Sequence, residues 1–155
     1  MYYIGFDIGG TKYASVLAQA DDGHIRLEKS GPAGYGKAGS FEGFCSGGSI
    51  AQLSGGRTAR DVAAAADKGD PKAKKILAKA GRYFGRGLAV LIDILNPEII
   101  VAGSIFARAG RHLTKTMYAE LKKEALPRSL SACRVVPAAL GEKIGDYGAI
   151  VTAMS

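Results

Sequence analysis

The sequence predicts an α/β fold, a class in which β-strands and helices alternate along the chain. Three observations support this class. Residues 2–18 have the pattern of a β-hairpin, residues 71–95 carry one apolar helical face, and an apolar strand over residues 98–102 is followed by a glycine and another helix. The chain has 155 residues, of which 47% are hydrophobic, so it has the length of one domain and enough apolar side chains for a core.

The predicted hairpin at residues 2–18 has a tip that suits an anion. Its first apolar run ends at Asp7, the adjacent Gly9 and Gly10 supply a tight turn, and a second apolar run covers residues 13–18. Paired glycines let the backbone adopt positive φ and bring unhindered N–H groups against an anion such as a phosphate. An ordinary Gly-Gly turn without a ligand fits the same residues equally well.

The residues beside this turn add groups that a bound phosphate needs. Thr11 supplies a hydroxyl and Lys12 supplies a cation. Asp7, at the end of the first strand, could hold a divalent cation or its water shell near the phosphate. The alternative is that Asp7 is a simple turn residue.

Two better-known phosphate motifs are excluded. Gly5 to Gly10 has the glycine spacing of a Walker A loop, but that loop continues with Lys and then Ser or Thr into a helix, whereas here Thr11 precedes Lys12 and a strand follows. Residues 34–39 match GxGxxG, yet no strand is predicted before them and no acidic residue stands about twenty positions further on. We therefore expect no dinucleotide site there.

The next segments change from strand to loop. A turn over residues 21–24 and an alternating pattern over residues 25–29 predict a third antiparallel strand, half exposed, with His24 solvated in the turn. Residues 30–56 are rich in glycine and serine and predict a long loop with one short helix near residues 49–53. Loops of this length in compact domains are usually functional or disordered.

Two helices follow this loop. The first is predicted from Arg57 or Thr58 to Asp67, and the second starts with Asp70 as N-cap and Pro71 at the first helical position. The second helix has one continuous apolar face, and its last third is apolar nearly all round, so we expect that end to be buried on both sides. The residues of this face are Ala73, Ile76, Leu77, Ala80, Phe84, Gly87, Leu88, Leu91 and Leu95.

The strand over residues 98–102 leads to a candidate ligand site. Asn96-Pro97 ends the long helix, and the strand itself ends at Gly103 and Ser104. In α/β proteins a small residue at the carboxyl end of a buried strand lies where ligands bind, and the N-terminus of the next helix favours an anion. Gly103 and Ser104 are therefore candidate ligand contacts, with a plain strand-to-helix turn as the alternative.

The last third of the chain predicts further alternation. The helix after Ser104 begins near Ile105 or Ala107 and is expected to end before Pro127. Residues 132–137 predict a further strand and residues 146–154 a final helix.

Charge and composition limit the classes of partner. The net charge is +7, but the basic residues are interleaved with apolar helical positions rather than gathered in one segment, so solvated helix faces explain most of them and no nucleic-acid partner is expected. The longest apolar stretch, residues 88–95, is too short to span a bilayer and contains Asp93. Without a signal-peptide pattern, cytoplasmic residence is expected. Cys45 and Cys133 show no metal-site spacing and predict buried or half-buried thiols.

Four ordered motifs resemble the ROK family of bacterial sugar kinases and repressors. They are Asp7-Ile8-Gly9-Gly10-Thr11-Lys12, Gly36-x-x-Gly39-x-x-Glu42, Leu95-Asn96-Pro97-Glu98-Ile99-Ile100-Val101-Ala102-Gly103 and Gly145-Asp146-Tyr147-Gly148-Ala149. The resemblance implies an actin-like, ribonuclease-H-type ATPase fold, here incomplete. Residues 1–30 would be its phosphate-hairpin portion. Residues 31–155 would hold a sugar loop, the long helix and a strand and helix beside the adenosine.

The resemblance also implies roles for site residues. The tip formed by Gly9, Gly10, Thr11 and Lys12 would meet the phosphates of ATP, with Mg²⁺ near Asp7. Glu42 would hydrogen-bond sugar hydroxyls, and Gly103 and Ser104 would lie by the adenosine. Without the resemblance, Glu42 would be expected to be an ordinary surface loop residue.

Three departures from the family pattern affect this reading. Family members are about twice as long, in keeping with two domains around a cleft, and here the third predicted strand passes directly into the loop at Ser30-Gly31. The absent middle is where the family has its catalytic aspartate, so the catalytic residue is unknown. The cysteine positions of the family's zinc motif are Ala33, Tyr35 and Ser40 here, so no zinc is expected. Ser104 replaces part of a glycine run.

Three hypotheses follow. The first is a ROK sugar kinase, glucokinase- or fructokinase-like, that transfers a phosphoryl group from ATP to a hexose hydroxyl and lacks an internal segment in this sequence. The second is a degenerate sugar- or nucleotide-binding protein without catalysis. A ROK repressor is less favoured, because the sequence starts directly on the hairpin without a helix-turn-helix. A homodimer is expected if the apolar face of the long helix is not covered internally.

Overall fold

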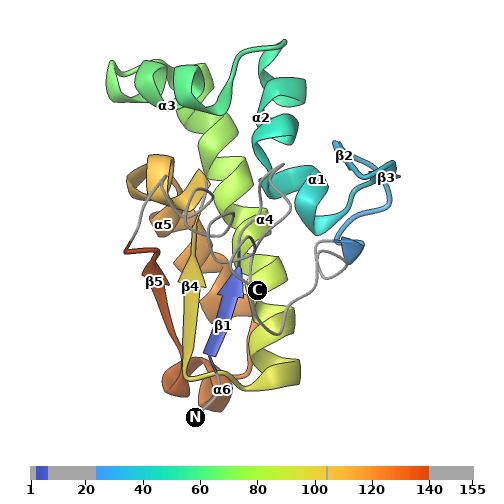
Figure 1. Ribbon diagram of the computed structural model, residues 1–155, viewed down its shortest axis with the longest axis vertical. Helices are drawn as coiled ribbons and strands as arrows, with labels where there is room; N and C mark the ends of the chain where they lie inside the picture. The colour runs from blue at the N-terminus through green and yellow to red at the C-terminus, as the bar shows by residue number, and fades with distance from the viewer. Residues whose placement is uncertain (1–2, 7–23, 104, 140–155) are drawn as a thin grey trace, which may run out of the picture.

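The computed structural model describes residues 3–6, 24–103 and 105–139 of the chain (Figure 1). This part contains both strands and helices, and helices separate the strands of its parallel sheet, as the α/β prediction requires. The elements are β1 (Tyr3–Phe6), β2 (Ala33–Gly34), β3 (Lys37–Ala38), α1 (Phe41–Cys45), α2 (Gly47–Ser54), α3 (Ala59–Asp67), α4 (Pro71–Leu95), β4 (Ile99–Ala102), α5 (Ile105–Glu124), α6 (Pro127–Ala132) and β5 (Arg134–Pro137).

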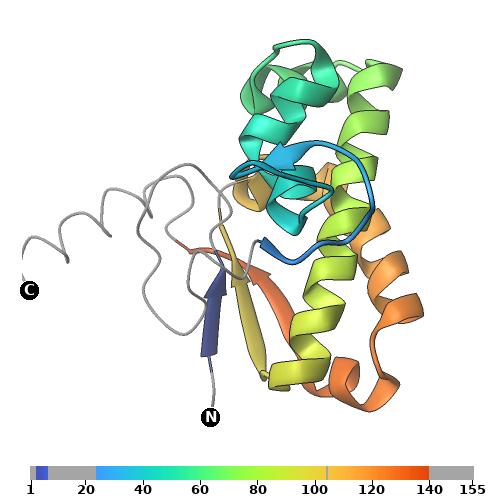
Figure 2. The same cartoon turned by 90° about the vertical axis from the view of Figure 1, so that its right-hand side faces the viewer.

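Three of these strands form a parallel sheet in the order β1-β4-β5. Phe6 on β1 pairs in register with Ala102 on β4, which pairs with Pro137 on β5. The three strands therefore end together at one edge. Helices α4 and α5 lie side by side on one face of this sheet (Figure 2). A parallel strand pair needs a crossover connection, and α5 and α6 supply it between β4 and β5.

The long helix α4 agrees with its prediction at both ends. The Asp70 carboxylate accepts hydrogen bonds from the backbone N–H groups of Lys72 and Ala73, which caps the N-terminus. At the C-terminus Asn96 adopts the left-handed conformation with φ of 45°. The last third is buried only in part, because Ile94 is 71% exposed.

The apolar face of α4 is covered from within the chain. Helices α5, α1 and α3 all pack against α4, and the side chains of Leu77, Leu88 and Ile92 are fully buried. The middle of this face is therefore covered within the chain, whereas Leu95 at its C-terminal end is 44% exposed. The charged residues lie on the opposite side: Lys72, Lys75 and other cations of α4 are exposed, which confirms the prediction of a solvated basic face.

Helices α4 and α5 approach closely because α4 has glycines at the contact. A Cβ at Gly81 would stand 2.6 Å from the Leu113 carbonyl oxygen, and one at Gly85 would stand 2.5 Å from that of Met117. The matched order of these pairs shows that the two helices run in the same direction.

In the described part of the chain, neither of them nor any other helix has the length and apolarity to cross a membrane.

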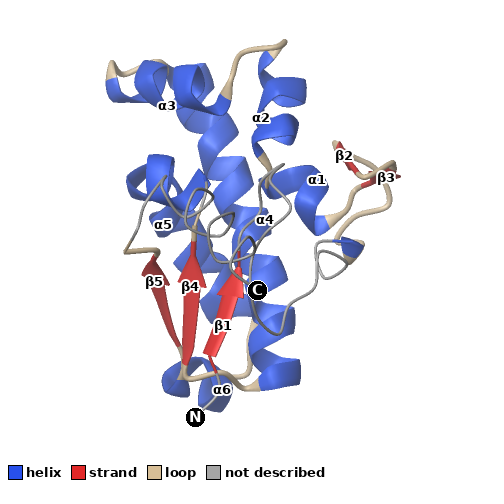
Figure 3. Ribbon diagram, viewed as in Figure 1, coloured by secondary structure: helices blue, strands red, loops and turns tan. Residues whose placement is uncertain are grey.

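The segment between residues 25 and 56 differs from its prediction. Residues 25–29 form no strand among the described elements, and one isolated β-bridge joins Arg26 to Ser40. The predicted long loop contains the β2–β3 hairpin and the helices α1 and α2 (Figure 3). Glycine-rich composition concealed these short elements, because their glycines serve turns and close contacts.

The prediction for Pro127 needs correction, and two predicted elements lie outside the described residues. Pro127 lies at the first position of a further helix, α6, which suits a residue without an N–H group, and β5 consequently begins at Arg134. Within the described residues, β1 pairs in parallel with β4. The second predicted hairpin strand, residues 13–18, and the predicted last helix, residues 146–154, lie outside the described residues.

Candidate functional site

The carboxyl edge of the parallel sheet is the first part of the candidate site. Because Phe6 and Ala102 are register partners, Asp7 and Gly103 are the next residues after two neighbouring strand ends. Gly103 is buried, and its carbonyl oxygen accepts a hydrogen bond of 3.0 Å from the N–H of Phe106 in the first turn of α5. Ligands of open α/β sheets bind outside this edge.

Most residues predicted to contact phosphate cannot be placed. Asp7, Gly9, Gly10, Thr11, Lys12 and Ser104 lie outside the described residues. Gly103 is the one predicted nucleotide contact within the described part. The geometry of the sheet nevertheless brings the chain to the start of the predicted phosphate segment at the same edge as Gly103.

Glu42 is the second part of the candidate site and lies in a helix rather than a loop. It occupies the first turn of α1, whose N-cap is Ser40, and the Ser40 hydroxyl accepts a hydrogen bond of 3.0 Å from the N–H of Gly43. The Glu42 side chain is half-buried. Partial burial raises the pKa of its carboxyl group above the ordinary value, and the nearby charge of His24 opposes this shift.

His24 is a site residue that the sequence did not indicate. It was expected to be a solvated turn residue, but it is half-buried and lies close enough to Glu42 to act on its charge. Its ring is also 6.0 Å from the ring of Tyr35, between centroids. Nothing in the local pattern marks His24, because its interactions join residues far apart in the sequence.

Backbone hydrogen bonds join the segment after His24 to the start of α1. The N–H groups of Leu27 and Glu28 donate to the carbonyl oxygen of Gly39, and the N–H of Phe41 donates to that of Ile25. These bonds cross the predicted junction at Ser30-Gly31, so the residues on both sides of it form one packed unit. The division of the chain at residue 30 stays a prediction.

The three positions of the family's zinc cysteines lie in and beside the β2–β3 hairpin. Gln52 holds Ala33 by two hydrogen bonds, since its side-chain oxygen accepts from the Ala33 N–H at 3.1 Å and its amide nitrogen donates to the Ala33 carbonyl at 3.0 Å. Tyr35 is exposed with φ of 46°, and Ser40 caps α1. Protein groups therefore hold this hairpin together.

Neither cysteine lies at these positions. Cys45 is buried in α1, where burial raises the pKa of its thiol, and Cys133 is half-buried before β5. Among the described residues, no cluster of three or more His, Cys, Asp or Glu side chains has the arrangement of a metal site.

These groups suit the recognition of a small polar molecule. A half-buried carboxylate can accept hydrogen bonds from hydroxyl groups, and the carboxyl edge of the sheet can receive the polar edge of a second ligand.

Comparisons with known proteins agree with this architecture. A family model described as the ROK family matches residues 18–155. A glucokinase of Halalkalibacterium halodurans is 31% identical over 147 residues, an alignment that covers 81% of this chain and 44% of that enzyme. The chain thus spans less than half the length of this relative.

Two further similar proteins represent both branches of the family. The crystal structure of a ROK hexokinase from Thermus thermophilus superimposes with a TM-score of 0.68 at 26% identity, covering 84% of this chain and 46% of that chain. The DNA-binding transcriptional repressor Mlc of Escherichia coli is 33% identical over 70 residues, which is 45% of this chain and 17% of the repressor.

Proposed function

The chain belongs to the ROK family and has part of its actin-like ATPase fold, as the motifs predicted. We propose that it is a sugar kinase that transfers a phosphoryl group from ATP to a hexose hydroxyl. The observation that carries this proposal is Glu42, a half-buried carboxylate in the first turn of a capped helix, whose start is hydrogen-bonded to residues 25–28. Such a group binds hydroxyls in a fixed direction. The similarity to a glucokinase over 81% of the chain supports a hexose as the ligand.

The nucleotide would bind at the carboxyl edge of the sheet. Gly103 would lie by the adenosine with Ser104, and the tip with Gly9, Gly10, Thr11 and Lys12 would bind the phosphates. The register of β1 with β4 supports a common location, because it brings the residues after both strands to one edge.

Mg²⁺ would lie near Asp7, directly or through water. When bound, the ion would neutralise charge on the phosphates during transfer. Glu42 would orient the sugar hydroxyls, and the backbone N–H groups of the glycine turn would orient the phosphates. The residue that accepts the hydroxyl proton is not among the sites assigned to this chain, because the sequence has no counterpart of the family's Asn-Asp-x-Asn-Ala stretch.

Calorimetric titration with glucose and with fructose tests this proposal. We expect the chain to bind one of them and Glu42→Gln to weaken that binding by about tenfold or more, because hydrogen bonds to a charged group are lost. Glu124→Gln, an exposed change of the same type on α5, serves as the matched control and should leave the affinity unchanged. Equal affinity of the wild type and Glu42→Gln would refute the role of Glu42.

A sugar-responsive regulator is the second candidate, because the matched 70 residues are as similar to a DNA-binding repressor as the longer alignment is to a glucokinase. A non-catalytic sugar-binding protein is a third. ATP turnover in the presence of the bound sugar separates the kinase from both. A sugar-dependent shift in DNA binding at physiological salt would favour the regulator.

A further inference from the structure

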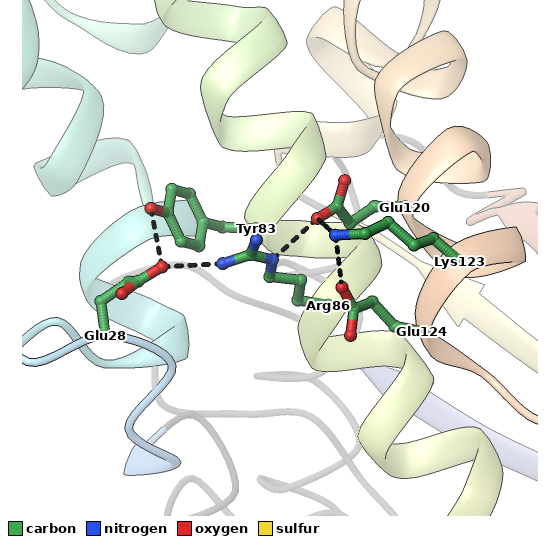
Figure 4. Close-up of polar contacts among 6 residues, drawn as sticks. All are labelled: Glu28, Tyr83, Arg86, Glu120, Lys123 and Glu124. Atoms are coloured by element: carbon green, nitrogen blue, oxygen red, sulfur yellow. Dashed lines mark hydrogen bonds and ion pairs between the residues drawn. The ribbon is translucent and has the colours of Figure 1, made fainter.

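A network of ion pairs connects Glu28, in the segment that precedes α1, to the two long helices α4 and α5 (Figure 4). Arg86 on α4 lies between two carboxylates: its Nη1 is 2.7 Å from Glu28 Oε1, and its Nε is 2.8 Å from Glu120 Oε1 on α5. The Tyr83 hydroxyl, one turn earlier on α4, donates to the same oxygen of Glu28 at 3.3 Å. Glu28 is therefore held against α4 by two side chains.

Glu28 is connected in turn to the residues that carry Glu42. Its backbone N–H and that of Leu27 share the carbonyl oxygen of Gly39 as acceptor, at 3.1 and 2.9 Å. A Cβ at Gly39 would stand 2.1 Å from the carbonyl oxygen of Glu28, so the two backbones are in contact. Gly39 is followed by Ser40, the N-cap of α1, and Glu42 lies in the first turn of that helix.

The same contacts also involve the aromatic packing of this segment. The rings of Tyr83 and Phe44 on α1 are stacked with centroids 3.6 Å apart, and the Arg86 guanidinium lies 5.3 Å from the centre of the Tyr83 ring. Hence one short stretch of α4 contacts both the Glu28 side chain, which precedes α1 in the sequence, and Phe44 in α1 itself.

We propose that Arg86 is a positioning residue for sugar binding: by holding Glu28 it fixes the backbone of residues 25–41 and, through it, the direction in which Glu42 presents its carboxylate. The inference rests on the proposed function, since it assumes that Glu42 contacts the sugar. It adds a residue that touches no sugar itself and acts through Glu28.

The experiment must separate this role from a role in folding. Glu120 is only 8% exposed, so Arg86→Gln would leave a buried carboxylate without its main partner and could unfold the chain. Glu28→Gln avoids this difficulty, because it keeps the Arg86–Glu120 pair and alters a carboxylate whose side chain is 39% exposed. Glu124→Gln is the control on the far side of the network, where it breaks only the pair with Lys123.

Two measurements on the full chain test the proposal. We expect Glu28→Gln to weaken binding of glucose or fructose, whichever the wild type binds, by about three- to tenfold at a temperature where the variant stays folded. We also expect faster hydrogen exchange at the amides of Leu27, Glu28 and Phe41, with no change at the amides of α5. Glu124→Gln should change neither quantity.

The outcomes distinguish the two proposals. Unchanged sugar affinity in a folded Glu28→Gln, or unchanged exchange at these three amides, overturns the role of Arg86. If the wild type binds neither sugar, the proposed function fails instead, and the role in sugar binding falls with it. The exchange measurement then still shows whether Glu28 holds the segment.

Discussion

Helices α4 and α5 and the segment of residues 31–43 both depend on glycine, but for different physical reasons. In α4 the backbone of Gly81 and Gly85 is ordinary helix, and the missing Cβ lets the backbone of α5 come close. In residues 31–43, Gly36 and Gly39 have φ of 76° and 72°, so the missing Cβ also permits a conformation that other residues avoid. Glycine sets an interhelical distance in one region and a backbone path in the other.

This difference shows why the two regions are stabilised differently. The helix pair is held by buried side chains such as Leu88 and Leu113, which are 0% and 1% exposed. The glycine-rich segment has few apolar side chains, and hydrogen bonds to Gln52, Ile25 and Glu28 hold it. Its structure therefore depends on contacts distant in sequence, and single changes there should have larger effects than in the helices.

The sharpest test is Gly39→Ala. The new Cβ would require a left-handed alanine and would stand 2.1 Å from a backbone oxygen of Glu28 that cannot easily move. We expect a loss of about 3 kcal/mol in the free energy of unfolding, measured by chemical denaturation. Gly36→Ala is the matched control, because φ is nearly the same and nothing lies within 4 Å of the new Cβ. It should cost about 1 kcal/mol. Equal stability losses in the two variants would show that the cost comes from the left-handed backbone conformation alone and not from the contact with Glu28.

Gly85→Ala tests the helix pair and should have a smaller effect. The clash with the Met117 carbonyl oxygen at 2.5 Å must separate α4 from α5, but alanine favours the helix, so we expect a net loss of about 1–2 kcal/mol. The matched change in α5 is Gly110→Ala, where the nearest atom is 3.8 Å away. That variant should gain up to about 1 kcal/mol. A gain for Gly85→Ala would contradict close packing as the reason for its glycine.

The smallest effect on stability is expected at Glu42, where it should have the opposite sign. Because partial burial raises the pKa of this carboxyl group, the folded state disfavours its ionised form, and the penalty is present at neutral pH. We expect Glu42→Gln to melt slightly higher than the wild type at pH 7. The difference should shrink as the pH falls through the raised pKa toward 4.5. A lower melting temperature for the variant at pH 7 would contradict this, and sugar binding should weaken all the same.

Prediction from the sequence succeeded better for the long helices than for the glycine-rich segment of residues 31–43. The end of α3 at Asp67, the cap at Asp70, the start of α4 at Pro71 and the strand before Gly103 were all predicted, because each depends on neighbours within a few residues. Helix α2 was predicted as the short helix near residues 49–53, whereas α1 was missed, since Ser40 caps it within a stretch whose glycines suggested a loop. For Glu42, resemblance to a family was needed, as a lone glutamate has no local signal.

The sequence by itself determined the long helices, their ends and the strand that precedes Gly103, because helical periodicity and capping are local properties. Only the tertiary structure decided that the strands run parallel in the order β1-β4-β5, that the His24 ring lies 6.0 Å from that of Tyr35 and that Arg86 reaches Glu28. These features arise where segments distant in the chain meet. They depend on which backbone segments can approach each other closely. A glycine permits such an approach, but its sequence position does not reveal which distant segment it will contact.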